Sequence, residues 1–259
     1  MTWALGVDGC PGGWVGAAVD PRGRVRWRTY REARDVLTDD APATAIDVPI
    51  GLPEAGPRAC DLHARRVLAR RGSTVFPAPP RRVLSARTYA EACAAARSAD
   101  GRAISRQTWL IVPRISDVDT VLTPTRQARI VEVHPELTFA TLAGRPLPSK
   151  RRAEGPKARL AALTGWLTDP ATILSAAPPQ ARPDDALDAL AAAWSAWRWL
   201  HGEARVLPCD NPPRDGPRLA HGDRRVTASA PPDPPAAGIL RPTALPGVSR
   251  RSACGYGCA

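Results

Sequence analysis

The sequence lacks the long apolar segments that membrane and secreted proteins carry. Within its 259 residues no apolar run approaches the roughly eighteen residues of a membrane span. No basic segment precedes the first apolar stretch, as it would in a signal peptide. We therefore expect a cytoplasmic protein that has no membrane partner.

Common metal-binding and disulfide patterns are missing as well. The six cysteines include no CxxC pair, and the four histidines do not occur at the spacing of zinc ligands. Because nothing in the sequence indicates a secretory context, we expect the thiols to be free. The composition therefore gives no support to a small domain stabilised by zinc or by disulfides.

Lysine is almost absent from a strongly basic chain. Lys150 and Lys157 are the only lysines among 36 basic residues, and the net charge is +11. Such a charge favours a nucleic acid as partner. A chain rich in arginine, alanine and proline is also what coding bias in a GC-rich genome produces. The charge alone therefore does not demonstrate this partner.

The N-terminal segment predicts a β-hairpin. An apolar run at residues 4–7 ends in Asp8, the turn-forming residues 9–13 follow, and a second apolar run covers residues 14–19. This pattern predicts two antiparallel strands with Asp8 at the end of the first. Asp before Gly is also a common turn former, and this is the alternative interpretation of Asp8.

Strands that alternate with helices predict an α/β fold with a mixed five-stranded sheet. After the hairpin, residues 24–30 indicate a third antiparallel strand, residues 31–38 a helix, and residues 43–48 and 129–133 two further strands. A right-handed crossover places the strand at 43–48 parallel to the first strand. We expect the strand at 129–133 to be parallel to it as well.

The chain is expected to form one domain with an insertion and a tail. Residues 50–128 are too long for a simple crossover and predict a helical insertion. The domain itself is expected to cover residues 1–207. Residues 208–259 hold 10 of the 29 prolines, a composition that predicts a disordered tail.

Aspartates lie where the predicted elements end. Asp47 lies in the fourth strand, and neighbouring strands are about 4.8 Å apart, so Asp8 and Asp47 should end side by side. Asp185 and Asp188 are three residues apart on the predicted helix at 184–200 and share one face. Asp185 can instead cap the helix N-terminus, whereas Asp188 lies among apolar residues and indicates a polar site.

Convergence of these carboxylates would require a counter-charge. Two carboxylates about 5 Å apart repel each other by roughly 3 kcal/mol at an effective dielectric near 20. A cluster of them persists mainly when a cation or a proton neutralises it. Oxygen ligands of this kind suit Mg²⁺ or Mn²⁺, and two such ions can catalyse the hydrolysis of a phosphodiester.

The order of the acids resembles the ribonuclease-H-like superfamily, and especially its Holliday-junction-resolvase branch. A closer resemblance is to the domain of unknown function 429, a family described as predicted nucleases with a ribonuclease-H-like fold. Six segments between residues 4 and 207 carry it: GVDGCPGGWVGA, IDVPIGLP, RRGSTVFPAPPR, ISRQTW, EVHPE and DDALDALAAAW. The resemblance implies a ribonuclease-H-like sheet and four metal ligands: Asp8, Asp47, Asp185 and Asp188.

Further residues of these motifs are candidates for the site. Glu132 is either an additional catalytic acid or the partner of an arginine, and we assign it to the site because burying an unpaired acid is costly. His134 is either a hydrogen-bonding group at a strand end or a proton carrier. The candidate substrate-binding residues are Arg70, Arg71, Ser73, Thr74, His134 and Glu136.

Together these features predict a nuclease that uses Mg²⁺ or Mn²⁺ to cleave DNA or RNA. Two alternatives stay open. The segment GVDGCPGGWVG also resembles the first phosphate loop of the actin-like kinases, although the chain lacks their second domain and second glycine-rich loop. A nucleic-acid-binding scaffold without turnover is the other alternative, and the presence of all four aspartates argues against it. The oligomeric state is not indicated.

Overall fold

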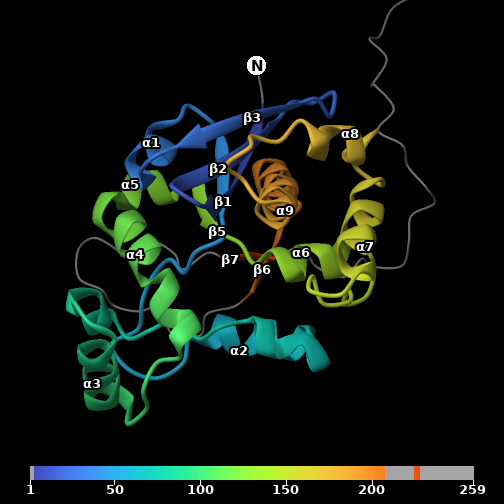
Figure 1. The fold of residues 1–259 in the computed structure, drawn as a ribbon. Coiled ribbons are helices and arrows are strands. Elements are labelled where there is room, and N and C mark those ends of the chain that lie inside the picture. Colours follow the sequence, from blue (N-terminus) through green and yellow to red (C-terminus); the bar gives the residue numbers. More distant parts are fainter. Residues whose placement is uncertain (1–2, 208–224, 228–259) are drawn as a thin grey trace, which may run out of the picture.

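A computed structural model describes residues 3–207 and 225–227 and shows a mixed sheet with helices on both faces (Figure 1). The strand order is β3-β2-β1-β4-β5-β7-β6. The first five strands are β1 (Ala4–Cys10), β2 (Gly13–Val19), β3 (Val25–Tyr30), β4 (Ala43–Ile46) and β5 (Ile130–Glu132). Strands β1, β2 and β3 pair antiparallel, and β4 and β5 run parallel to β1. The predicted five-stranded arrangement is therefore confirmed.

Two further short strands extend the sheet beyond β5. Strand β7 (Arg225–Thr227) pairs parallel with β5, and β6 (Arg205–Leu207) pairs antiparallel with β7. The sheet thus has seven strands in the part of the chain that the structure describes, where five were predicted. Strand β7 belongs to the segment predicted to be a disordered tail; the other residues of 208–259 lie outside the described residues.

The hairpin between β1 and β2 is tighter than the sequence predicted. Asp8 pairs with Val15 inside β1, and β1 continues to Cys10, so that only Pro11 and Gly12 form the turn. Gly12 has a φ of 81°, a conformation that glycine adopts without strain. Asp8 is therefore a strand residue, and its interpretation as a turn former is wrong.

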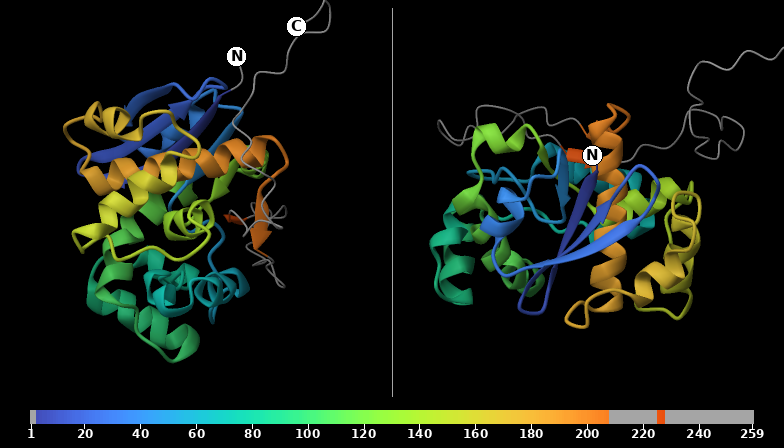
Figure 2. Two further views of the ribbon diagram at one scale, coloured as in Figure 1. Left: turned by 90° about the vertical axis from the view of Figure 1, so that its right-hand side faces the viewer. Right: turned by 90° about the horizontal axis from the view of Figure 1, so that it is seen from above.

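Helix α9 (Pro183–Leu200) lies directly against β1 on one face of the sheet, as both views of Figure 2 show. The contact is close because Gly6 has no side chain: a Cβ on Gly6 would lie 1.9 Å from the backbone nitrogen of Ala193. The α6 helix (Pro135–Leu142) and the α7 helix (Glu154–Leu163) pack beside α9 on the same face. Glycine at position 6 thus determines how near α9 comes to the central strand.

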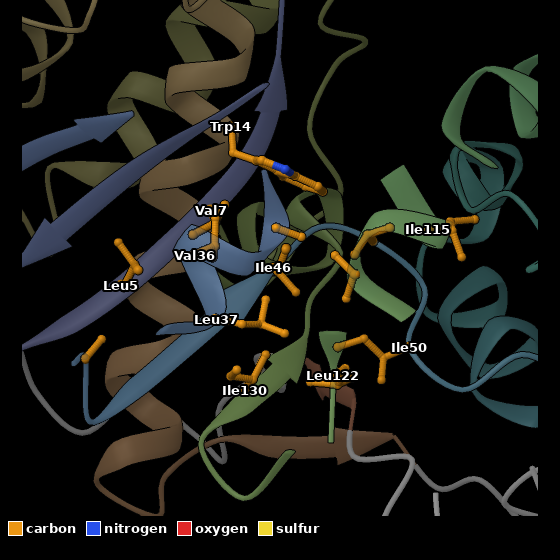
Figure 3. Packing of buried hydrophobic residues seen from close by; sticks show 14 of the residues in the cluster. Leu5, Val7, Trp14, Val36, Leu37, Ile46, Ile50, Ile115, Leu122 and Ile130 are labelled. Carbon is orange, nitrogen blue, oxygen red and sulfur yellow. The ribbon is translucent and has the colours of Figure 1, made fainter. Parts of the chain in front are cut away.

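The opposite face of the sheet is covered by α1 (Ala33–Thr38) and α4 (Arg106–Val121). Figure 3 shows the side chains of Val7, Ile46 and Ile130 from the strands beside Leu37 and Ile115 from these helices. The α4 helix contains Pro113 in its interior and belongs to the predicted helical insertion. Helices on both faces bury the central strands, as expected for parallel strands.

The predicted helical insertion is present, and its residues 59–100 lie at the lower end of the view in Figure 1. Its remaining elements are α2 (Ala59–Val67), the 3₁₀ helices η1 (Ala69–Thr74) and η2 (Arg81–Ser85), α3 (Tyr89–Asp100) and α5 (Pro124–Gln127). The short α8 (Pro170–Ser175) precedes α9. Of the helices that the structure describes, none has the length and apolar character required to span a membrane.

Candidate functional site

Asp8 and Asp47 lie on neighbouring strands and on the same face of the sheet. Val7 of β1 is paired in register with Ile46 of β4, and the N–H of Asp47 donates to the carbonyl oxygen of Val7 at 3.1 Å. Side chains alternate along a strand, so Asp8 points to the same face as Gly6. Because Gly6 contacts α9, both carboxylates lie on the α9 face.

The direction of α9 brings Asp188 to these two carboxylates. Ala193 lies at Gly6, and α9 runs opposite to β1, so the residues before Ala193 lie toward the end of β1 that carries Asp8. Asp188 is only 6% exposed. We call Asp8, Asp47 and Asp188 the carboxylate cluster. Three elements that are distant in sequence thus contribute one acid each.

Asp185 lies at the edge of the carboxylate cluster and also caps α9. Its Oδ2 accepts a hydrogen bond from the N–H of Arg182 at 3.0 Å. Burial raises the pKa of Asp185, and the charge of Asp185 in turn contributes to the raised pKa of Asp8. The helix-capping interpretation of Asp185 is therefore confirmed, and the residue still lies close enough to affect Asp8.

Burial raises the pKa of every acid in the carboxylate cluster, and repulsion by neighbouring acids adds to it. Burial raises the pKa of Asp8 well above its usual value, and the charges of Asp188 and Asp47 raise it further. Burial is also the main reason why the pKa of Asp47 reaches about 7 and that of Asp188 about 6. The metal-free protein thus favours the protonated forms of these carboxyl groups more than water does.

Lys150, which sequence analysis did not assign to the site, provides the nearest positive charge. Its Nζ lies 2.9 Å from Oδ2 of Asp188 and 3.5 Å from Oδ2 of Asp184. The charge of Lys150 lowers the pKa of both Asp47 and Asp188, against the larger effect of burial. The one available signal in the sequence was its rarity, since Lys150 is one of two lysines.

Glu136 connects the carboxylate cluster to two arginines. Its Oε1 pairs with the buried Arg159 and lies 3.8 Å from Nη2 of Arg71. The charge of Glu136 contributes to the raised pKa of Asp47 and Asp188, so Glu136 is close to both. Arg71 and Glu136, both predicted to bind substrate, therefore lie beside the carboxylate cluster.

His134 lies next to the same group and presents a free lone pair. Its Nε2 is 3.2 Å from the carbonyl oxygen of Thr74, which can only accept, so Nε2 carries the proton. Burial lowers the pKa of His134, which favours the neutral ring. Nδ1 then has a lone pair and is buried, with no hydrogen-bond partner among the described residues.

Arg70 and Ser73 do not join this group. Both are exposed on η1, and neither makes a side-chain hydrogen bond or an ion pair within the region that the structure describes. Thr74 contributes its backbone carbonyl to His134, while its hydroxyl donates to the carbonyl oxygen of Arg71 at 2.7 Å. Of the predicted substrate-binding residues, Arg71, Thr74, His134 and Glu136 thus lie together.

Glu132 lies outside the carboxylate cluster, on the other face of the sheet. It is paired in register with Ile46, so it shares the face of Val7 rather than that of Asp8. Its carboxylate contacts Nη1 of the buried Arg58 at 3.1 Å and accepts from the N–H of Ile50 at 2.9 Å. Glu132 is therefore the partner of an arginine, the alternative that the sequence left open.

The donor chemistry of the carboxylate cluster fits a divalent cation, although the side chains as placed do not form a ligand set. Within residues 3–207 and 225–227 no three His, Cys, Asp or Glu side chains are grouped closely enough to hold a metal ion. The pKa values of the buried acids are nevertheless raised, so a bound cation would favour their charged forms, and the unpartnered Nδ1 of His134 adds a lone pair nearby. Oxygen donors with this charge suit Mg²⁺ or Mn²⁺ once their side chains rearrange.

Comparison with protein families identifies the chain. A family model described as a protein of unknown function (DUF429) matches residues 6–213. The chain belongs to the DUF429 family. Neither the curated proteins nor the solved structures include a match to it. The order β3-β2-β1-β4-β5 gives this DUF429 protein a ribonuclease-H-like sheet topology.

The raised pKa of Asp47 predicts how stability depends on pH. Its ordinary value is 3.8 and its value in the folded protein about 7, so between these pH values the folded chain binds more protons than the unfolded chain. The free energy of unfolding should therefore fall as the pH rises from 4 to 8, by about 4 kcal/mol for Asp47. Urea unfolding at several pH values, without divalent ions, measures this change.

The variant Asp47→Asn isolates this contribution. His134 has a lowered pKa and acts in the opposite direction, so only the difference between the native protein and the variant reports on Asp47. We expect the variant to lose less stability than the native protein over this pH range. Parallel pH profiles for the two proteins would show that Asp47 does not take up a proton.

Proposed function

We propose that this DUF429 protein is a metal-dependent nuclease that hydrolyses phosphodiester bonds in nucleic acid. The observation that carries the proposal is the carboxylate cluster, in which acids from β1, from the residue after β4 and from α9 are buried together and all have raised pKa values. Such a group takes up protons or cations. The ribonuclease-H-like topology supports the proposal but does not carry it, because one fold serves many functions.

Each residue of the site has a role in this proposal. Asp8, Asp47 and Asp188 would hold Mg²⁺ or Mn²⁺. Ions bound there would activate a water and stabilise the leaving oxygen of the phosphodiester. The free lone pair on Nδ1 of His134 can accept a proton from that water. Arg71 lies beside Glu136 and can contact a phosphate of the substrate.

A basic surface beside the site suits a polyanionic substrate. The α2 and η1 helices carry Arg65, Arg66 and Arg70 in addition to Arg71. Arg66 and Arg70 are exposed, and neither pairs with a carboxylate of the described residues. An arginine that has no acidic partner can bind phosphate without first breaking an ion pair. The net charge of +11 agrees with this use of the surface.

A nucleotide-binding enzyme is the second candidate function, because a pocket lies at the hairpin turn. The pocket has a volume of about 390 Å³. Its lining residues are Cys10, Pro11, Gly12, Gly13, Trp14, Thr29, Tyr30, Arg31 and Gln180. This is the position at which the sequence resembles a phosphate loop. Stabilisation of the protein by ATP, measured as a rise in melting temperature, would favour this function.

The test of the proposed function is cleavage of labelled single-stranded, duplex, hybrid and junction substrates. We expect cleavage of at least one substrate with Mg²⁺ or Mn²⁺ and none after a chelator is added. Binding of the same substrate should weaken as salt is raised, because phosphate contacts release counter-ions. Salt-sensitive binding without cleavage under any condition would instead support a scaffold.

A further inference from the structure

Lys150 approaches the carboxylate cluster from its open side. The side chain of Lys150 is 42% exposed, whereas that of its partner Asp188 is 9% exposed. A lysine ammonium is a compact, strongly hydrated charge on a flexible four-carbon chain. Lys150 can therefore leave Asp188 without movement of the backbone, while Asp188 itself stays in place.

The structure also provides an alternative partner for this ammonium. Oδ2 of Asp184 lies 3.5 Å from the same Nζ, and the side chain of Asp184 is 46% exposed. Asp184 is one helical turn before Asp188 on α9 and is not part of the carboxylate cluster. A small rotation of the lysine side chain thus transfers the ammonium from a buried acid to an exposed one.

The backbone around Lys150 is held independently of this ion pair. Nη1 of the buried Arg159 donates to the carbonyl oxygens of Pro148 and Gly155, each at 3.0 Å. Gly155 in turn packs so closely that a Cβ there would lie 2.2 Å from the carbonyl oxygen of Ser149. The loop therefore presents Lys150 at the same place whether or not its ammonium is on Asp188.

A divalent cation held by Asp188 would compete with the lysine ammonium for the negative charge of the same carboxylate. Lys150 pairs with only one of the three acids of the carboxylate cluster, whereas a divalent cation would favour the ionised form of all three. An ammonium that stays at Asp188 would repel such a cation strongly in a partly buried site.

We propose that Lys150 is an exchangeable counter-ion, whose ammonium neutralises Asp188 in the metal-free protein and moves to Asp184 when a divalent cation binds. The inference rests on the proposed function, because it requires that the carboxylate cluster binds metal. It assigns to Lys150 a positioning role: the residue keeps the acids compensated until metal arrives and weakens metal affinity by competition. Replacement of Lys150 by methionine should raise the affinity for Mg²⁺ about tenfold or more.

The scarcity of lysine makes the exchange directly observable. Reductive methylation of the full chain with ¹³C-formaldehyde labels two lysines and the N-terminus, and keeps the charge. Lys150→Arg and Lys157→Arg assign the two NMR signals. Addition of Mg²⁺ alone should move the Lys150 signal toward the position that it has in metal-free Asp188→Asn. Lys157 is exposed and serves as the internal control, since its signal should not move.

An independent measurement of metal binding separates this inference from the proposed function. Calorimetry with Mg²⁺ on the labelled protein, on Lys150→Met and on Lys157→Met gives the three affinities. Tighter Mg²⁺ binding by Lys150→Met, together with a shift of the Lys150 NMR signal on addition of Mg²⁺, supports the exchange. Binding of Mg²⁺ with a stationary Lys150 signal and equal affinities would overturn the exchange and leave the metal site. Absence of Mg²⁺ binding in all three proteins would overturn both proposals.

Discussion

Replacing Asp47 with asparagine should reduce metal-dependent cleavage about a thousandfold or more, while the variant becomes more stable than the native protein in the absence of metal. The loss follows because the amide has no charge with which to hold a divalent cation. The gain follows because Asp47, with its pKa raised to about 7, is partly ionised at neutral pH, and its burial as a carboxylate costs free energy. Cleavage rates and urea unfolding of the same preparation measure the two effects.

A loss of activity combined with a gain in stability distinguishes a functional acid from a structural one. A residue that stabilises the fold would lower activity and stability together when it is replaced. Asp35, an exposed acid in the first turn of α1, provides a matched control, and Asp35→Asn should leave both quantities near their native values. If Asp47→Asn cleaves at the native rate, the metal lies elsewhere and the carboxylate cluster is not the active site.

How much of this site the sequence could predict depends on the element that carries each residue. Asp8 and Asp47 could be placed because parallel strands with a crossover bring corresponding positions side by side, and a strand residue two places from Gly6 must share its face. Asp188 could be placed because an acid inside an apolar helix requires a polar neighbour. In each case a local pattern determined the geometry.

Glu132 shows where this reasoning fails. The same rule of alternation applies to β5, but its outcome depends on whether Glu132 is in register with Ile46 or with Asp47. A shift of one residue exchanges the two faces of the sheet. Local sequence patterns do not determine the register between β4 and β5. The structure pairs Glu132 with Ile46. The acid therefore faces Arg58 of the insertion rather than the carboxylate cluster.

Lys150 and Arg159 were not predicted as site residues, and the reason is different. Lys150 lies in a loop that has no periodic pattern, and its place beside Asp188 depends on the buried Arg159, which binds the loop carbonyl of Pro148. Long-range contacts of this kind follow from the packing of α6, α7 and α9, not from local spacing. Scarcity alone distinguished Lys150 in the sequence, and scarcity does not locate a residue.

Replacing Arg58 with methionine should destabilise the protein by about 3–5 kcal/mol, since it removes the guanidinium that pairs with two buried acids. Arg58, Asp61 and Glu132 are each less than 5% exposed. The guanidinium bridges both carboxylates and also donates to the carbonyl oxygen of Ile50 at 2.9 Å. For a domain of this size the melting temperature should fall by roughly 10 °C. Calorimetry or urea unfolding measures the loss.

An exposed ion pair of the same type is the matched control. Arg24 pairs with Asp20 at 2.7 Å, but its side chain is 61% exposed, and Arg24→Met should therefore cost less than about 1 kcal/mol. An equal cost for Arg24→Met and Arg58→Met would show that the buried pairs do not anchor the insertion. The comparison keeps the chemistry of the substitution constant and changes only its burial.

Neutralising the acids along with Arg58 tests the cause of the loss. If the cost of Arg58→Met comes from uncompensated buried charge, Arg58→Met combined with Asp61→Asn and Glu132→Gln should recover part of the stability, because amides are cheaper to bury than carboxylates. If it comes from the released carbonyl of Ile50, the triple variant should recover none. Ile50 lies three residues after Asp47, so the second result would mean that Arg58 holds the segment that follows Asp47 in the carboxylate cluster.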